Sequence, residues 1–423
     1  MKEVMMKLKF IAAVTTVLCT MGAAHAAKIE LVVDYVYPEM FNKTQEVIAK
    51  KFNEKFPDYS VKFRAPTPDY EVAAQQALRH AVTKQLADVS FQGLNRQRIF
   101  VDRGIAVDLK PFIQAEKNWD KSGYSASLME LGQIQGKQVG IGFALSTPIV
   151  YYNMNLVNKA GTTVDQLPKT WDDIIKLGEA SRKASPQTGG IYFDWGITGN
   201  WLWQALLFAD GGKILNSTEK KVAFDDAKGL KAMNTMASMV QNGTMSNISY
   251  QEAAQMFVAG KLAVLSSSTS RLGVLEKQIG DRFKLVTGMF PVTAEGGKVP
   301  AGGNVAMMFT KDPERQKAAW EFIKFATGPE GATVMTKNTG YFPANTLPID
   351  DPKALKGYYE SNPNQYTAVK QIPWLTGWYA FPGQNGLKIT DVIDDHVQTV
   401  FDRSKQPADA LKAMSADVQK LLD

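Results

Sequence analysis

The alternation of apolar strands with amphipathic helices after residue 27 is the feature that most constrains the fold. "KIELVVDYV" (28–36) is rich in β-branched residues and predicts a buried strand, and "YSVKFRA" (59–65) and "ADVSF" (87–91) predict two more. Helices are predicted between these strands, over 38–55 and 68–85. Strands separated by helices pair in parallel through crossover connections, so the sequence predicts an α/β fold with mainly parallel sheets.

Capping signals place further helices along the chain. Thr170 precedes "WDDIIKLGEASRK" with Asp173 three positions on, and Asp312 precedes a helix whose first residue is Pro313. The segment 407–423 predicts one more amphipathic helix. The 423 residues suffice for two or three domains, and the sequence contains no repeat or low-complexity linker. We therefore expect any two domains to be joined by ordinary strands.

The first 26 residues predict a secretory signal peptide. Three lysines in the first nine residues precede an apolar stretch over 10–24, which is too short to anchor in a bilayer, and "AHA" (24–26) supplies a small-x-small cleavage pattern. A lipid anchor is the alternative, but it needs a small residue before Cys19, where Leu18 stands. We therefore expect export to the periplasm.

Composition argues against several kinds of chemistry. The single cysteine, Cys19, lies in the predicted signal peptide, so cysteine nucleophiles, disulfides and thiolate metal sites are excluded from the mature chain. The net charge of +6 is small for this length and argues against a nucleic-acid partner. A secreted hydrolase stays as an alternative, although no G-x-S-x-G is present and only His80 and His396 follow residue 26.

Five segments carry a resemblance to a known family. They are "STPIVYYNMNLVNKAG" (146–161), "PKTWDDI" (168–174), "MFVAGKLAVLSSS" (256–268), "AGGNVAMMF" (301–309) and "AAWEFIKFATGPEGATVMTKNTGYFPAN" (318–345). In this order they resemble the periplasmic solute-binding proteins of ABC importers, a family that includes maltose- and glycerol-3-phosphate-binding proteins. The Ser-Thr-Pro before the tyrosines and the Gly-Tyr-x-Pro are similar to the glycerol-3-phosphate branch.

The resemblance implies two α/β lobes joined by three crossing segments, with a solute bound between them. We expect 27–142 plus 293–327 to form lobe 1, and 143–292 plus 328–423 to form lobe 2. A ligand that contacts both lobes only when they close biases the hinge toward closure. The implied partners are a small solute and the ABC permease subunits of the inner membrane, powered by a cytoplasmic ATPase. We expect a monomer that is not an enzyme and needs no cofactor or metal.

The candidate site residues follow strands or belong to the resembling segments. Ligands gather at the carboxyl ends of parallel strands, and Asp34, Tyr35, Tyr37, Tyr70, Gln92 and Asn95 follow the first three predicted strands. Five tryptophans in two windows, 195–203 and 374–378, are predicted to lie in loops, where they offer flat faces to a sugar. The residues predicted to bind the ligand are Tyr70, Gln92, Ser146, Trp201, Ser267, Arg271, Gly302, Gly303, Tyr341 and Trp378.

One departure from the family bears on the solute. The glycerol-3-phosphate branch has a phosphate-pairing arginine in the loop before its last helices, and here that position falls at or near Pro382 in "TGWYAFPGQNGLK" (376–388). The nearest cation is Lys388, and Arg271 is another candidate. A flexible ammonium replaces a bidentate guanidinium poorly. We therefore expect a neutral sugar, oligosaccharide or polyol, with glycerol 3-phosphate or a glycerophosphodiester as the alternative.

The adjacent Tyr151 and Tyr152 raise the alternative of an iron-binding protein of the same architecture. Strand side chains alternate between faces, so at most one of the two could face a cleft. Packing of both rings in the core is the favoured interpretation, because the pair falls inside the strand that resembles sugar-binding proteins.

Overall fold

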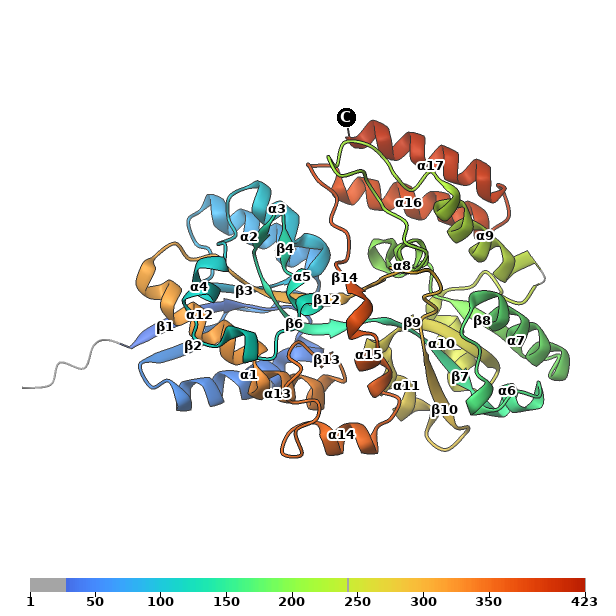
Figure 1. Ribbon diagram of the computed structural model, residues 1–423, viewed down its shortest axis with the longest axis horizontal. Coiled ribbons are helices and arrows are strands. Elements are labelled where there is room, and N and C mark those ends of the chain that lie inside the picture. The colour runs from blue at the N-terminus through green and yellow to red at the C-terminus, as the bar shows by residue number, and fades with distance from the viewer. Residues whose placement is uncertain (1–27, 242, 423) are drawn as a thin grey trace, which may run out of the picture.

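The computed structural model describes residues 28–241 and 243–422, which form two α/β lobes with the chain crossing between them (Figure 1). The predicted signal peptide over 1–26 lies outside the described residues. No helix within 28–241 or 243–422 is long and apolar enough to span a bilayer.

The first lobe is built on a six-stranded sheet of order β13-β6-β12-β3-β1-β2. Strands β1, β2 and β3 pair in parallel, whereas β12 runs antiparallel to both β3 and β6. The strands are β1 (Ile29–Asp34), β2 (Tyr59–Phe63), β3 (Val89–Gly93), β6 (Ile141–Ser146), β12 (Gly302–Met308) and β13 (Phe342–Pro343), with a hairpin of β4 (Gln133–Ile134) and β5 (Lys137–Gln138). The helices are α1 (Pro38–Lys55), α2 (Tyr70–Val82), α3 (Gln97–Asp102), α4 (Lys110–Ala115), α5 (Ala126–Glu130), α12 (Pro313–Thr327) and α13 (Pro329–Thr339).

The second lobe is built on a four-stranded sheet of order β10-β7-β9-β8. Strands β8 and β9 are parallel, and the other pairs are antiparallel. The strands are β7 (Pro148–Asn153), β8 (Gly189–Phe193), β9 (Leu262–Ser268) and β10 (Leu285–Met289). The helices are α6 (Met154–Lys159), α7 (Trp171–Ala184), α8 (Trp201–Ala209), α9 (Ala227–Gln241), α10 (Tyr250–Val258), α11 (Leu272–Ile279), α14 (Lys356–Ser361), α15 (Tyr366–Lys370), α16 (Gly386–Phe401) and α17 (Pro407–Leu422).

The chain passes between the two sheets at three places. Strand β6 ends at Ser146 in the first sheet and β7 begins at Pro148 in the second, so one residue separates them. The second passage leads from β10 to β12 through β11 (Val299–Pro300). The third is part of the segment between β13 and α16, and its strand β14 (Leu375–Thr376) pairs with β11. This is the α/β arrangement predicted from the sequence.

Strand pairing places the lobe boundaries differently from the sequence-based expectation. The expected break at 142/143 falls inside β6, which stays in the first sheet as far as Ser146. The segment 328–343, expected in lobe 2, packs against the first lobe, because β13 pairs with β6 and α13 contacts α1. We propose that lobe 1 comprises 28–146 and 302–343, and that the intervening segments and the remainder belong to lobe 2 and the passages.

Helix starts follow the predicted caps. The Thr170 hydroxyl accepts a hydrogen bond from the Asp173 amide at 3.2 Å, and the Asp312 carboxylate accepts one from the Arg315 amide at 2.9 Å. The Gly328-Pro329 pair ends α12 as expected, but Pro329 then occupies the first turn of α13. Helix α1 has the predicted bounds of 38–55.

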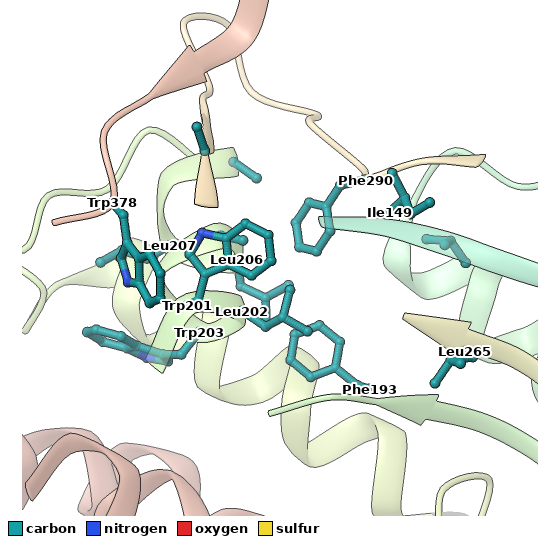
Figure 2. Packing of buried hydrophobic residues seen from close by; sticks show 14 of the residues in the cluster. Ile149, Phe193, Trp201, Leu202, Trp203, Leu206, Leu207, Leu265, Phe290 and Trp378 are labelled. Atoms are coloured by element: carbon teal, nitrogen blue, oxygen red, sulfur yellow. The ribbon is translucent and has the colours of Figure 1, made fainter. Parts of the chain in front are cut away.

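The prediction that the first tryptophan window forms a loop is wrong for Trp201 and Trp203. Both lie in α8, which is buried on nearly every side (Figure 2). A helix that is apolar all round shows no polar face and so lacks the amphipathic pattern by which helices are recognised in sequence. Trp203 packs edge-on against Phe224, with ring centroids 5.2 Å apart.

The two adjacent tyrosines lie in the core of the second lobe, as the favoured interpretation expected. Tyr151 is 0 % exposed and Tyr152 is 1 % exposed. The Tyr151 hydroxyl donates to the Ser268 carbonyl at 2.6 Å, and burial raises the pKa of both phenols. Neither ring faces an opening, which argues against an iron site at this pair.

Candidate functional site

The carboxyl ends of the parallel strands of both lobes meet at the first passage of the chain. The end of β6 at Ser146 pairs with Gly302 at the start of β12, and β3 ends opposite Asn304 on the same strand. In the second lobe the start of β7 at Pro148 pairs with Ser268 at the end of β9. Loops that follow β1 and β3 therefore lie near those that follow β8 and β9, which is where ligands gather in α/β sheets.

The floor of this region combines three of the predicted residues. An alanine Cβ placed at Gly302 would lie 2.8 Å from the Ser146 hydroxyl oxygen and 2.9 Å from a ring carbon of Trp201. Glycine is therefore the only residue type at position 302 that lets the Ser146 hydroxyl and the Trp201 indole lie this close to the strand. Gly303 has a φ of 104°, and a Cβ there would lie 1.9 Å from the Ala144 carbonyl oxygen.

The first-lobe wall is a group of tyrosines beside Asn304. The Asn304 side-chain amide donates to the Tyr70 hydroxyl at 3.1 Å, and the Tyr70 ring lies edge-on to Tyr37 with centroids 5.1 Å apart. Burial raises the pKa of Tyr70 well above its usual value, so Tyr70 is a neutral donor. Tyr341, from the segment just before β13, is also buried and packs on Phe41 at 5.7 Å.

The second-lobe wall is a cluster of Asp194, Ser267, Tyr250 and Arg271. The Ser267 hydroxyl donates to Asp194 Oδ2 at 2.6 Å, and the Arg271 guanidinium lies over the Tyr250 ring at 4.9 Å. Burial raises the pKa of Asp194 to about 6, against the opposing effects of the Ser267 hydrogen bond and the Arg271 charge. Burial likewise raises the pKa of Tyr250 to about 12.

Arg271 links the two walls. Its charge lowers the pKa of Asp194 and Tyr250 in the second lobe and of Tyr37 and Tyr341 in the first, although burial outweighs it at each of these groups. The guanidinium forms no ion pair with any residue within 28–241 or 243–422.

Trp378 supports the floor from the third passage. Its indole N–H donates to the Gly199 carbonyl at 3.2 Å, and its ring lies 5.9 Å from that of Trp201 (Figure 2). Gly199 has a φ of 70°, and a Cβ there would lie 2.6 Å from a Trp378 ring carbon. Both indoles are buried and their planes are tilted by 44° to each other, so together they form an aromatic base under the site.

Gln92 lies apart from the other predicted residues. Its amide donates to the Ser90 hydroxyl at 2.9 Å, and its side chain lines a small separate cavity with Asp34 and Thr67. Side chains alternate along β3, so Gln92 and Gly93 face opposite sides of the sheet, and Gly93 is the one beside Tyr70.

Several polar atoms at the site are buried without a partner among the described residues. They are Asn304 Oδ1, Asn95 Oδ1 and Trp201 Nε1. Buried polar atoms are normally hydrogen-bonded, so a bound molecule or water would satisfy them. Asn304 and Asp194 were not selected from the sequence, although Asp194 comes directly after a strand, which was the available signal.

Two cavities open between the lobes beside this site. One of about 110 Å³ is lined by Glu71, Asn95 and Arg96 of the first lobe and by Gly199 and Thr390 of the second. The other, of about 500 Å³, is lined by residues that include Arg98 and Glu130 of the first lobe and Lys213, Glu219 and Trp378 on the other side.

Comparison with known proteins decides the family. The family model of bacterial extracellular solute-binding proteins matches residues 47–367. The chain belongs to the bacterial extracellular solute-binding protein family. This confirms the function class predicted from the sequence, which is solute binding for an ABC importer.

Curated relatives and solved structures agree with this assignment. The chain is 25% identical over 402 residues to the sn-glycerol-3-phosphate-binding periplasmic protein UgpB of Escherichia coli K12, covering 87% of each chain. Its fold is similar to that of the cyclic alpha-maltosyl-1,6-maltose binding protein of Arthrobacter globiformis, at 19% identity and a TM-score of 0.80, covering 93% of this chain and 99% of that one. UgpB of Mycobacterium tuberculosis in complex with glycerophosphocholine aligns at 21% identity and a TM-score of 0.79, covering 93% and 98%.

These relatives indicate the general partners and location of proteins in this family. Members of the family bind small solutes, work with an ABC permease and its ATPase, and act outside the cytoplasm. The relatives are binding proteins and not enzymes.

Proposed function

We propose that this protein captures a neutral sugar, oligosaccharide or polyol in the periplasm and delivers it to an ABC permease of the inner membrane. It acts as a monomer, performs no catalysis and needs no cofactor or metal. The observation that carries the proposal is the convergence of unpartnered buried polar atoms and aromatic rings from both lobes on the first passage of the chain.

Hydrogen-bonding capacity at the site favours a solute with hydroxyl groups. The unpartnered oxygens of Asn304 and Asn95 and the carboxylate of Asp194 accept hydrogen bonds. The Trp201 N–H and the Tyr70 hydroxyl donate. A hydroxyl both donates and accepts, so a polyhydroxylated solute matches this mixed set, and the aromatic rings match its C–H faces.

Glycerol 3-phosphate or a glycerophosphodiester is the second candidate. The exposed guanidinium of Arg271, free of ion pairs with the described residues, offers a partner for a phosphate. The relatives from Escherichia coli and Mycobacterium tuberculosis, whose names refer to such compounds, support this candidate.

Binding works through a shift in the hinge equilibrium. A solute that touches the Tyr70 wall and the Asp194 wall at once gains contacts only when the lobes are together, so it stabilises that arrangement. A micromolar affinity requires about −8 kcal/mol, which a few hydrogen bonds and one or two stacked rings supply. The permease then recognises the closed surface.

Titration calorimetry of ligand-stripped protein tests the proposal. The panel contains monosaccharides, oligosaccharides, polyols, glycerol 3-phosphate and glycerophosphocholine. We expect micromolar or tighter binding of a neutral compound. Tyr70→Phe removes a hydroxyl from the site and should weaken that binding about 2- to 10-fold, the value of one neutral hydrogen bond.

Tyr358→Phe is the matched control, because Tyr358 is half-buried beside Tyr359 in α14 and outside the site. Binding of a phosphate compound with no neutral compound would replace the proposed solute by the second candidate. Equal affinities of wild type, Tyr70→Phe and Tyr358→Phe would remove Tyr70 from the site.

A further inference from the structure

Asp194 is a buried carboxylate whose position serves no evident structural purpose. It follows β8 directly, is 3 % exposed, and its backbone N–H donates to the Ser266 carbonyl at 3.0 Å. Its side chain has one hydrogen bond among the described residues, from the Ser267 hydroxyl to Oδ2. The second oxygen, Oδ1, has none.

Asp88 shows how a buried carboxylate with a structural role is paired and hydrogen-bonded in this chain. Asp88 is 4 % exposed and is bonded by the Arg315 guanidinium through both oxygens, with one oxygen also accepting from the Val32 amide at 2.7 Å. A buried charge is tolerated when it is paired and fully hydrogen-bonded. Asp194 has no such ion pair, and an asparagine would accept the same hydrogen bond from Ser267 at a lower desolvation cost.

The neighbours of Asp194 define what its free oxygen can meet. Ser267 is a predicted ligand contact, and Tyr250, whose ring lies under the Arg271 guanidinium, belongs to the same wall. The Arg271 guanidinium, held over the Tyr250 ring, acts on Asp194 and on the first-lobe tyrosines 37 and 341. Ser267 lies at the end of β9 and Arg271 three residues beyond that strand, so the free carboxylate oxygen and a guanidinium donor belong to the same wall, at the end of β9.

We propose that Asp194 contacts the solute directly and determines specificity for hydroxyl donors. Ser267 holds one carboxylate oxygen, the other accepts from a solute hydroxyl, and Arg271 donates to the adjacent solute oxygen. Such an acceptor and donor side by side match the two hydroxyls of a vicinal diol. A phosphate group, which presents acceptors and negative charge, is disfavoured on the same wall. This inference rests on the proposed function and names the part of the solute that this wall selects.

Asp194→Asn tests the inference, since it keeps the side-chain shape and the bond from Ser267 while removing the charge. Calorimetry on the full chain uses two probes: the sugar or polyol that wild type binds most tightly, and glycerol 3-phosphate. We expect Asp194→Asn to lower the affinity for the neutral compound about 10- to 100-fold, the effect of losing a charged hydrogen bond. Its affinity for glycerol 3-phosphate should stay the same or rise.

Asp210→Asn is the matched control. Asp210 is also a second-lobe carboxylate with a 15% exposed side chain, but it pairs with Lys231 at 2.5 Å and caps the end of α8. This variant loses the same charge and should change neutral-solute affinity less than about 2-fold, which is a small fraction of one hydrogen bond. Circular dichroism and thermal melting establish that each variant is folded. Ser267→Ala provides a second test, because it removes the hydrogen bond that holds Asp194 Oδ2. It should lower the affinity for the neutral compound as well.

The outcomes separate this inference from the proposed function. Unchanged neutral-solute affinity in Asp194→Asn overturns the inference and leaves the proposed function standing. If wild type binds only glycerol 3-phosphate, the proposed solute is wrong. In that case a several-fold stronger affinity of Asp194→Asn for glycerol 3-phosphate supports a place for Asp194 beside the solute, and an unchanged affinity overturns it.

Discussion

At the scale of single residues, the charge state of Asp194 connects stability to binding. Its carboxyl group has a pKa near 3.8 in the unfolded chain and about 6 in the folded one, because burial disfavours the charged form. Between these values the folded protein holds a proton that the unfolded chain has lost. The contribution of Asp194 to the free energy of unfolding therefore falls as pH rises from about 4 to about 6, and stays low above that.

Asp194→Asn should consequently stabilise the ligand-free protein at neutral pH. An asparagine carries no charge to desolvate, and a pKa shift of about two units corresponds to an upper limit of about 3 kcal/mol. We expect a gain of about 1–3 kcal/mol at pH 7 and almost none at pH 4. Urea denaturation of variant and wild type at both pH values measures the difference, in which contributions from other carboxylates cancel. A variant less stable than wild type at pH 7 would contradict the assignment of Asp194 as a buried charge that destabilises the ligand-free protein.

At the scale of elements, the pairing of β6 with β12 depends on two glycines. The register shifts between Asn304 and Val305, and Gly303 next to this bulge has a positive φ, where a Cβ would collide with the Ala144 carbonyl oxygen. A side chain at 303 would push β6 and β12 apart at the end that holds Ser146. The site thus inherits its shape from the strand pair below it.

Gly303→Ala should lower the free energy of unfolding by about 2 kcal/mol or more, because it adds a Cβ at a positive φ and against backbone that cannot move aside. Gly273→Ala is the control, since Gly273 lies in α11 and a Cβ there would have no other atom within 4 Å. That change should stabilise the protein by about 0.5–1 kcal/mol through helix propensity. Equal effects of the two substitutions in chemical denaturation would disprove the requirement for glycine at 303.

Elements with a periodic pattern or a cap were predictable from sequence, and those without were not. Helices α1, α7 and α12 have amphipathic faces or capping residues, and they form where predicted. Helix α8 is apolar all round, and β13 has two residues, too few for any alternation to show. Because β13 was not predicted, the expected lobe boundaries differ from those that we propose for 328–343.

The sequence predicted which segments form the candidate site better than it predicted which side chains line it. Tyr70, Ser146 and Ser267 come together because each follows or ends a strand at the same edge, or belongs to a segment that resembles the family. Asn304 and Asp194 belong to no repeating pattern, and their significance depends on partners that are distant in sequence. Only the tertiary structure shows that both side chains are buried and that each has an oxygen without a hydrogen-bond partner among the described residues.

At the scale of the whole molecule, an ionic contact joins the lobes at the larger cavity beside the candidate site. Arg98 on α3 of the first lobe binds Glu219 of the second at 2.6 Å, and Tyr379 on the third passage donates to the same carboxylate at 3.3 Å. Arg98 is also held by Asp102 at 2.9 Å, and its side chain is 11% exposed. The pair therefore stabilises the arrangement of the lobes described above.

Arg98→Gln should loosen this arrangement. Without the pair, solute binding has to supply the lost stabilisation, so we expect affinity to fall about 2- to 10-fold and the ligand-free radius of gyration to rise. Calorimetry and small-angle X-ray scattering measure the two effects. Arg103→Gln, an exposed arginine close by in the chain, should change neither. Identical behaviour of the two variants would mean that the ionic contact does not influence the hinge.

The central position of β12 in the first sheet has a consequence for how the chain is made. β12 lies between β3 and β6, yet it comes more than 150 residues after β6 in the sequence. During synthesis from the N-terminus, β1, β2, β3 and β6 emerge long before the strand that joins them. A nascent chain that ends before residue 302 consequently lacks a complete first lobe, and its half-built sheet stays open until most of the protein has left the ribosome.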